Sequence, residues 1–133
     1  MAEKNYFYGQ GRRKSSTARV RLSSKKGTVT INAKTLDEYL NGSKYLHHEL
    51  LKPFNALELD PENYTVSVKV SGGGHASQID AIRLGISKAL VELNNDFRGS
   101  LKKADLLSRD SREKERKKFG FLKARKKRQY TKR

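Results

Sequence analysis

The stretch YTVSVKVSGGGHASQIDAIRLGISKALVEL, residues 64–93, carries the strongest structural signal in the chain. Every second residue of its first seven is apolar, which predicts a β-strand with one face on a core. After SGGGHASQ, apolar residues recur at spacings of three and four, which predicts an amphipathic helix. The residues of this helical stripe are Ile79, Ile82, Ile86, Leu90 and Leu93.

Small residues run beside that stripe. Ala81, Gly85 and Ala89 lie four apart and therefore on one side of the predicted helix. A glycine inside a helix costs about 1 kcal/mol relative to alanine. We therefore expect Gly85 to serve a close approach between the helix and a neighbouring element.

The region before this stretch predicts further strands and short helices. TARVRLS, residues 17–23, alternates so that one face enters a core and the other presents Arg19 and Arg21. The following SSKKG reads as a turn and TVTIN, residues 28–32, as a strand, so the two runs predict a hairpin. The other expected elements are a helix from a capping box at Thr35 to Leu40, a helix over 43–52 ending near Pro53, an extended piece at 57–59, a turn at 60–63 and a last short helix over 97–107.

The charge of the chain is concentrated in two places. The 133 residues carry a formal net charge of +16. Residues 12–26 hold seven cations and residues 117–133 hold nine, with no acid in either segment, while the remainder balances fourteen cations against fourteen acids. A neutral body with two basic segments is typical of a protein that binds a polyanion.

Other features of composition narrow the class of protein. The chain has no cysteine, which excludes disulfides and thiolate metal sites and fits a reducing cytosol. No uncharged run approaches the length of a membrane span, and the first residues do not resemble a signal peptide. We therefore expect a cytoplasmic protein without a membrane partner.

The apolar content falls sharply after Leu107. We predict a globular RNA-binding domain over residues 1–107 and an extended basic tail over residues 108–133, disordered unless bound to RNA. The mixed charges of residues 108–116 are typical of a solvated segment. Residues 117–133 combine unpaired cations with aromatic side chains, a composition suited to phosphate contacts and base stacking.

The triple glycine after the predicted strand has three interpretations. A helix N-terminus attracts phosphate, but GGGHASQ is neither GxGxxG nor GxxxxGK[ST], so it lacks the residues of a nucleotide loop. A tight strand-to-helix turn is the plain alternative. The third interpretation is a loop that approaches an RNA phosphate without holding a nucleotide.

No catalytic or metal-binding pattern is visible. His47 and His48 are adjacent and would point about 100° apart on a helix, so they cannot chelate one metal well. No serine occurs in G-x-S-x-G, and the acids show no catalytic spacing. We expect no enzyme activity, no cofactor, no metal and no small-molecule substrate.

Three stretches together resemble a known family. GQGRRKSSTARVRL, GGGHASQIDAIRLGISKAL and KKFGFLKARKKRQYTKR occur in this order and spacing in the bacterial form of the small-subunit ribosomal protein nine family. The resemblance covers essentially the whole chain. It implies an α+β fold: a small mixed sheet of about four strands, helices on one face and a left-handed βαβ crossover, followed by an extended basic tail.

The resemblance also implies partners. The body would bind rRNA in the head of the small ribosomal subunit, beside neighbouring ribosomal proteins. The tail would reach the anticodon stem-loop of tRNA in the peptidyl site and so support translation. Compared with many relatives, this chain has Leu122 in place of a lysine and Arg128 in place of a proline, and it ends in Thr-Lys-Arg rather than Ser-Lys-Arg.

The expected site residues follow from the charge pattern, the glycine turn and the resemblance together. The expected rRNA-binding residues are Arg12, Arg13, Lys14, Arg19, Arg21, Gly72, Gly73, Gly74, Lys117, Lys118, Lys123, Arg125, Lys126, Lys127 and Arg128. The expected tRNA-binding residues are Thr131, Lys132 and Arg133.

Two other classes of function stay open at this point. A small phosphotransferase would use the glycine turn, and a family of small-molecule kinases resembles the left-handed fold, but the chain is short and shows no catalytic Lys–Asp pair. A nonspecific DNA-compacting protein would also suit the charge, because phosphate attraction does not separate DNA from RNA.

Overall fold

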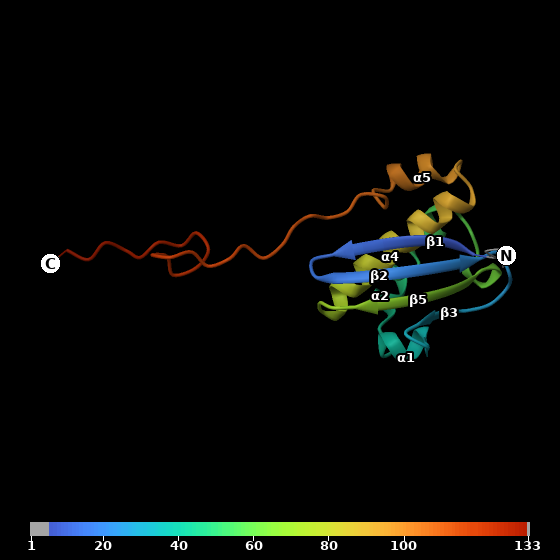
Figure 1. Ribbon diagram of the computed structural model, residues 1–133, viewed down its shortest axis with the longest axis horizontal. Helices are drawn as coiled ribbons and strands as arrows, with labels where there is room; N and C mark the ends of the chain where they lie inside the picture. The colour runs from blue at the N-terminus through green and yellow to red at the C-terminus, as the bar shows by residue number, and fades with distance from the viewer. Residues whose placement is uncertain (1–5, 133) are drawn as a thin grey trace, which may run out of the picture.

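The computed structural model describes residues 6–132 as a mixed sheet with helices packed on one face (Figure 1). The sheet has five strands in the order β1-β2-β5-β3-β4. The α+β expectation is confirmed, and the strand beyond the expected four is accounted for by the two-residue β4. The elements are β1 Phe7–Arg13, β2 Ser16–Ser23, β3 Val29–Ile31, β4 Lys34–Thr35, α1 Leu36–Leu40, α2 Lys44–Leu50, α3 Lys52–Ala56, the 3₁₀ turn η1 Pro61–Asn63, β5 Thr65–Ser71, α4 His75–Leu93 and α5 Phe97–Lys103.

Apolar and polar side chains alternate along the strands β2 and β5, as the sequence predicts. The two strands are antiparallel, and Val20 lies opposite Val68. The alternate apolar residues of both strands are buried, and their polar neighbours form the opposite face. The β2–β5 pair therefore supplies much of the sheet side of the core.

The strand β1 is an edge strand paired antiparallel with β2 through a two-residue turn at Lys14 and Ser15. Its inward positions are Gly9 and Gly11 rather than large apolar residues. A glycine-containing strand buries little by itself, so the sequence pattern did not reveal it. The strand is stabilised instead by close contact with α4.

The predicted hairpin between β2 and β3 is wrong. The strand β5 lies between them, and β3 pairs with β5 in parallel. The connection after β2 is held at the start of β5, because Gly27 donates its N–H to the carbonyl of Glu62 at 3.1 Å and Thr65 Oγ1 donates to the carbonyl of Lys25 at 3.0 Å. The helices α1–α3 join the parallel strands β3 and β5, which forms the βαβ crossover unit.

Helix α4 covers β1 and β2 and completes the core. Its stripe residues Ile79, Ile82, Ile86 and Leu90 are almost fully buried, while Leu93 is half-buried. They pack with the inward valines and leucine of the sheet. The helix begins at His75, before the first residue of the stripe.

The short helices follow the sequence predictions in part. Thr35 caps α1 by accepting the N–H of Glu38 at 3.4 Å, and the helix ends at Leu40, with Asn41 as its C-cap at φ 51°. Helix α2 ends at Leu50, near Pro53 as expected, but Pro53 itself lies in the first turn of a further helix, α3, where its missing N–H has no helical partner to lose. Leu57 lies in a turn and Leu59 follows it without regular structure, rather than on an extended piece. The 3₁₀ turn η1 and helix α5 lie where a turn and a last helix were expected.

None of the helices described between residues 6 and 132 is long and apolar enough to cross a membrane.

Candidate nucleic-acid interface

The face of the sheet opposite α4 is open, and its side chains form ordered rows across β1, β2 and β5. Residues that pair across strands stand side by side on this face. The three rows are Tyr8–Arg21–Ser67, Gln10–Arg19–Lys69 and Arg12–Thr17–Ser71. We call these nine residues the open sheet face.

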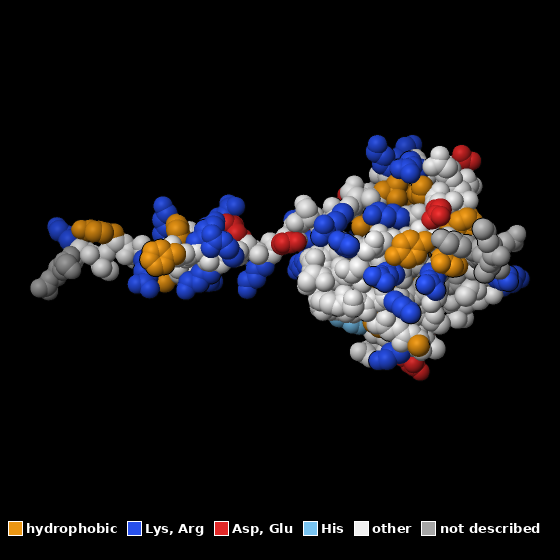
Figure 2. All heavy atoms as spheres, viewed as in Figure 1, with side chains coloured by type: hydrophobic (Ala, Val, Ile, Leu, Met, Phe, Trp, Pro, Cys, Tyr) orange, Lys and Arg blue, Asp and Glu red, His pale blue; other side chains and the backbone are white. Residues whose placement is uncertain are grey.

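The open sheet face carries cations and no acid. Its charged residues are Arg12, Arg19, Arg21 and Lys69, and all four are exposed. Figure 2 views the molecule from this side, with Lys and Arg side chains spread over the sheet. Aromatic groups lie among them: Tyr8 is 41% exposed, and the guanidinium of Arg21 stacks over the ring of Tyr6 at 5.1 Å. Such a surface can contact phosphates and stack on bases.

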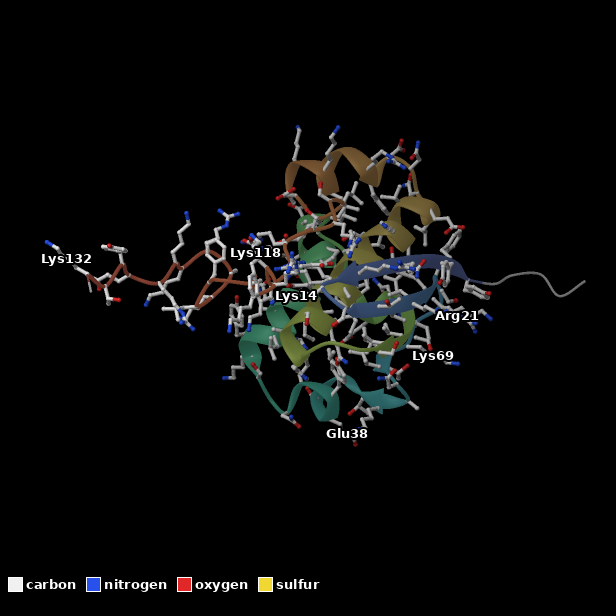
Figure 3. All side chains as sticks on the ribbon, turned by 60° about the vertical axis from the view of Figure 1, so that its left-hand side comes forward. Lys14, Arg21, Glu38, Lys69, Lys118 and Lys132 are labelled. Atoms are coloured by element: carbon white, nitrogen blue, oxygen red, sulfur yellow. The ribbon has the colours of Figure 1, made fainter. Side chains whose placement is uncertain are left out.

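The turn between β1 and β2 meets the glycine turn at one end of the body. Lys14 is exposed at the tip of the β1–β2 turn, with φ 52° (Figure 3). Ser16 Oγ donates a hydrogen bond to the carbonyl of Gly72 at 2.9 Å. The expected sites around residues 12–14 and 72–74 are therefore neighbours in space, although Ser16 and Gly72 are 56 residues apart in the chain.

The geometry of the glycine turn supports the interpretation as a tight strand-to-helix connection. Gly72 and Gly73 have φ values of 77° and 67°, and a Cβ on Gly73 would lie 2.0 Å from Ser16 Oγ. At the start of α4, the N–H of Gly74 donates to Ser77 Oγ at 3.2 Å, and that hydroxyl donates to the carbonyl of Gly74 at 3.1 Å. His75 stacks on Tyr39 with ring centroids 4.9 Å apart. The turn is exposed, so its backbone stays accessible to a partner.

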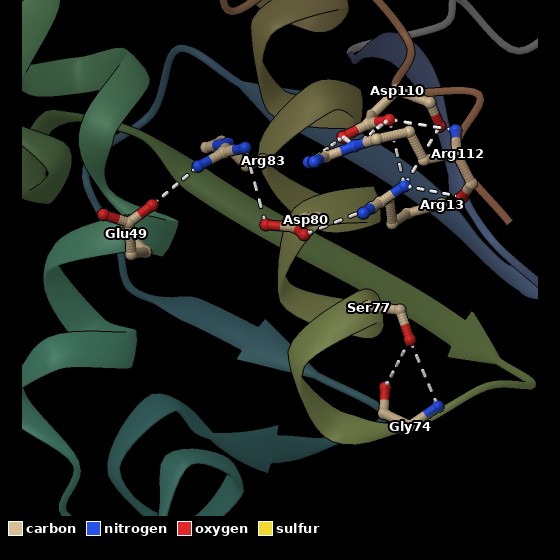
Figure 4. A network of polar contacts seen from close by, with 8 residues as sticks. All are labelled: Arg13, Glu49, Gly74, Ser77, Asp80, Arg83, Asp110 and Arg112. Atoms are coloured by element: carbon tan, nitrogen blue, oxygen red, sulfur yellow. Dashed lines mark hydrogen bonds and ion pairs between the residues drawn. The ribbon is translucent and has the colours of Figure 1, made fainter. Parts of the chain in front are cut away.

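Arg13 lies apart from the other expected RNA-binding residues. Its side chain is only 12% exposed and faces α4 and the start of the tail (Figure 4). It pairs with Asp80 on α4 at 3.5 Å and with Asp110 at 3.1 Å. It also donates to the carbonyl of Arg112 at 2.9 Å.

The tail leaves the body on the side of the β1–β2 turn (Figure 1). Its cations are mostly exposed, and so are Phe119 at 102% and Tyr130 at 86%. Within it, Leu122 donates its N–H to the carbonyl of Lys126 at 2.8 Å, which closes a small loop. Thr131 and Lys132 are exposed, and Arg133 lies outside the described residues.

Two tail cations that were expected to be unpaired within their own segment have a partner just before it. Glu115 accepts hydrogen bonds from Lys118 and from Arg125, the latter at 2.9 Å. The hydrogen bond from Lys118 is the main reason that the pKa of Glu115 lies below its ordinary value. The pKa of Asp110 is also lowered, chiefly because Arg112 donates a side-chain hydrogen bond to it and less through its backbone N–H and the charge of Arg13.

Sequence reasoning missed one cation of the candidate interface. Lys69 lies directly opposite Arg19 across the β2–β5 pair. The strand prediction for residues 64–70 already placed Lys69 on the polar face. The missing information was that β5 pairs with β2, which only the tertiary structure supplies.

The histidines show no metal-binding arrangement. Across residues 6–132, no group of three His, Asp or Glu side chains lies in a position to hold a metal ion.

Comparison with known proteins identifies the family. A model of the family described as Ribosomal protein S9/S16 matches residues 11–133. The chain belongs to this family. A relative called small ribosomal subunit protein uS9 from Aliarcobacter butzleri (strain RM4018) is 47% identical over 126 residues, which covers 95% of this chain and 97% of the relative. The protein of the same name from Mycoplasmopsis pulmonis (strain UAB CTIP) is 47% identical over 127 residues, which covers 96% of this chain and 92% of that relative.

Membership of the S9/S16 family confirms the resemblance seen in the sequence. This member of the family is a structural constituent of the small ribosomal subunit in the cytoplasm, with a part in translation and without enzymatic activity. The family sets aside both the phosphotransferase and the DNA-compacting alternatives.

Proposed function

We propose that this S9/S16 protein binds rRNA of the subunit head through the open sheet face and the β1–β2 turn, and that its tail continues through RNA to tRNA in the peptidyl site. The observation that carries the first part is a four-cation face with no acid and no covering helix. Contacts from such a face go mainly to phosphate and sugar, so they position the protein rather than read sequence.

The glycine turn extends this surface at the end where Lys14 lies. Backbone groups of Gly72, Gly73 and Gly74 are exposed beside the β1–β2 turn. RNA that crosses the open sheet face toward Arg12 and Lys14 would meet these glycines next. Their lack of side chains would let a phosphate come close to the backbone.

The tail would become ordered on RNA, which supplies the missing countercharge. Its cations would neutralise phosphates that are packed closely together, and its exposed aromatic side chains would stack on bases. The terminal Thr131, Lys132 and Arg133 would contact the backbone of the tRNA anticodon stem-loop. This last assignment is supported by the match of the family model, which extends over these residues.

The sheet proposal is tested with the triple variant Arg19→Gln/Arg21→Gln/Lys69→Gln. We expect weaker binding to small-subunit rRNA and a plot of log affinity against log salt that is shallower by about 2–3, because each lost phosphate contact removes ~0.7–0.9 of slope. The matched control is Lys88→Gln/Lys102→Gln/Lys103→Gln, which removes three exposed cations from α4 and α5. Equal effects of the two triple variants would refute a dedicated sheet interface.

The tail proposal is tested by deleting Lys132 and Arg133. Small subunits should still assemble, but their affinity for tRNA in the peptidyl site should fall. Lys102→Gln/Lys103→Gln removes the same charge from α5 and should leave tRNA affinity unchanged. Equal tRNA affinity of intact and shortened subunits would count against the contact.

A further inference from the structure

Two adjacent arginines on β1 have different surroundings. Because side chains alternate along a strand, Arg12 stands on the open sheet face and Arg13 on the opposite side. Arg12 has no ion pair among the described residues, whereas Arg13 is surrounded by acceptors. Four contacts within 3.5 Å occupy its guanidinium: the carboxylates of Asp80 and Asp110 and the carbonyls of Asp110 and Arg112.

These contacts join the first residues of the tail, Asp110 and Arg112, to the folded body. Asp80 also pairs with Arg83 at 3.4 Å, and Arg83 pairs with Glu49 on α2 at 2.6 Å (Figure 4). On the tail side, Asp110 accepts a hydrogen bond from Arg112 Nη2 at 2.7 Å. The connected side chains therefore come from α2, α4, β1 and the segment that follows Leu106, the last buried residue of the described chain.

The charges of this cluster balance. Arg13, Arg83 and Arg112 face Glu49, Asp80 and Asp110, so three cations meet three carboxylates. A guanidinium that already pairs with two carboxylates attracts a phosphate poorly, because its charge is compensated and its N–H donors are in use. The cluster thus differs from the open sheet face, whose cations have no carboxylate among them.

We propose that Arg13 is a positioning residue that fixes where the tail leaves the body, and that it does not contact RNA. We call the contacts among Arg13, Asp80, Asp110 and Arg112 the clasp. Without it, the chain would be anchored only as far as Leu106 and Leu107, which pack in and against the core, and residues 108–112 would join the free segment. Each extended residue adds ~3.3–3.6 Å of reach, so the volume searched by the tail would grow and its effective concentration at its target would fall.

The clasp itself can be tested in the free protein, independently of any RNA. Because the natural chain has no cysteine, Ser100→Cys on α5 and Glu113→Cys just beyond the clasp give two defined positions for spin labels. We expect Arg13→Gln to broaden the distribution of distances between the labels, and Arg12→Gln to leave it unchanged. Asp110→Asn breaks the clasp from the tail side, outside the core, and should broaden the distribution in the same way even if Arg13→Gln impairs folding.

The effect of the clasp on RNA binding rests on the proposed function. Measuring the binding of each variant to small-subunit rRNA tests the clasp and the sheet interface separately. Arg12→Gln should make the salt dependence shallower, while Arg13→Gln should leave that slope unchanged and lower affinity only through the loosened tail. An unchanged distance distribution in both Arg13→Gln and Asp110→Asn would overturn the clasp. A loss of slope in Arg13→Gln equal to that in Arg12→Gln would overturn its separation from RNA. If Arg12→Gln leaves the salt dependence of RNA binding unchanged while Arg13→Gln and Asp110→Asn still broaden the label distances, the sheet interface is refuted and the clasp is supported.

Discussion

At the scale of single residues, the close contact between β1 and α4 depends on the glycines Gly9 and Gly11, which have no side chain. A Cβ on Gly9 would lie 2.0 Å from the carbonyl oxygen of Gly85, and a Cβ on Gly11 would lie 1.8 Å from that of Ala81. Real Cβ atoms do not approach backbone oxygens so closely, so strand and helix would have to separate. Glycine on the strand and small residues on the helix thus allow a backbone-to-backbone contact.

Gly11→Ala should lower the free energy of unfolding by about 1–3 kcal/mol, the usual range for overpacking a core. Gly99→Ala is the matched control, because its Cβ would meet nothing within 4 Å and it lies inside α5. The control should raise stability by up to about 1 kcal/mol through helix propensity. Urea unfolding of both variants measures the difference, and an unchanged midpoint for Gly11→Ala would contradict the close contact.

Asp110 offers a prediction about pH. Its pKa is lowered mainly by the hydrogen bond from Arg112, so the folded protein keeps this carboxylate charged at pH values where an unfolded aspartate, with a pKa of about 3.9, gains a proton. A lowered folded pKa contributes stability that is present above the unfolded value and is lost as pH falls through the folded value. In an NMR titration, Arg112→Gln should raise the pKa of Asp110 toward its ordinary value, and Arg13→Gln should raise it less. The same pKa in all three proteins would show that these contacts do not persist in solution.

The sequence foresaw only one side of the β1–α4 contact. The row of Ala81, Gly85 and Ala89 predicted a close neighbour, and the structure confirms it. The identity of that neighbour could not be predicted, because Gly9 and Gly11 lack the apolar side chains by which a strand is recognised. The two glycines become informative only when β1 is placed against the helix.

At the scale of elements, local patterns predicted the strongest strand and helix but not their neighbours. Hydrophobic alternation located β2 and β5, and spacings of three and four located α4. Pairing between strands is decided by tertiary contacts, and here residues 25–27 bond to the segment around Glu62 and Thr65 instead of turning β3 back onto β2. For the same reason the sequence did not place Lys69 beside Arg19 in the candidate interface.

The turn between β3 and β4 gives a test of how these elements are joined. Asn32 and Ala33 both have positive φ, and the Asn32 side chain bonds β5 twice: it accepts the N–H of Val70 at 2.9 Å and donates to its carbonyl at 3.1 Å. Asn32→Ala should lower the free energy of unfolding by roughly 2–3 kcal/mol, about 1 for each hydrogen bond and about 1 for the left-handed backbone. Asn32→Gly should cost less, because glycine adopts this φ freely. Thermal unfolding compares them, and a wild-type melting temperature for Asn32→Ala would show that the side-chain bonds contribute nothing.

At the scale of the whole molecule, the buried core and the basic tail lie in different parts of the chain. Among the described residues, those that form the core all precede Leu107, whereas nine cations lie between Lys117 and Arg133. Residues 12–26 and residues 117–133 together carry a charge equal to the whole net charge of the chain, and the remaining cations and acids balance in number. Charge patterning along the sequence predicted this division, but it did not separate Arg13, which pairs internally, from Arg12 and Lys14.

This division predicts that deleting residues 117–133 affects binding and not stability. The deletion removes no buried residue of the described core and leaves the clasp of Arg13, Asp80, Asp110 and Arg112 in place. The midpoint of urea unfolding should therefore stay within error of the intact protein. The salt dependence of binding to small-subunit rRNA should become shallower by up to about 6, if all nine tail cations contact phosphate at ~0.7 each.

Intermediate results would show how the tail cations are used. Glu115 already pairs with Lys118 and Arg125, so a smaller decrease in slope is expected if these ion pairs survive on RNA. Glu115→Gln would then release two cations and make the slope of the intact protein steeper, whereas Glu113→Gln removes the same charge two residues away and should leave it nearly unchanged. If the deletion lowers stability as strongly as it lowers RNA affinity, the tail is part of the fold, and the division between core and tail is wrong.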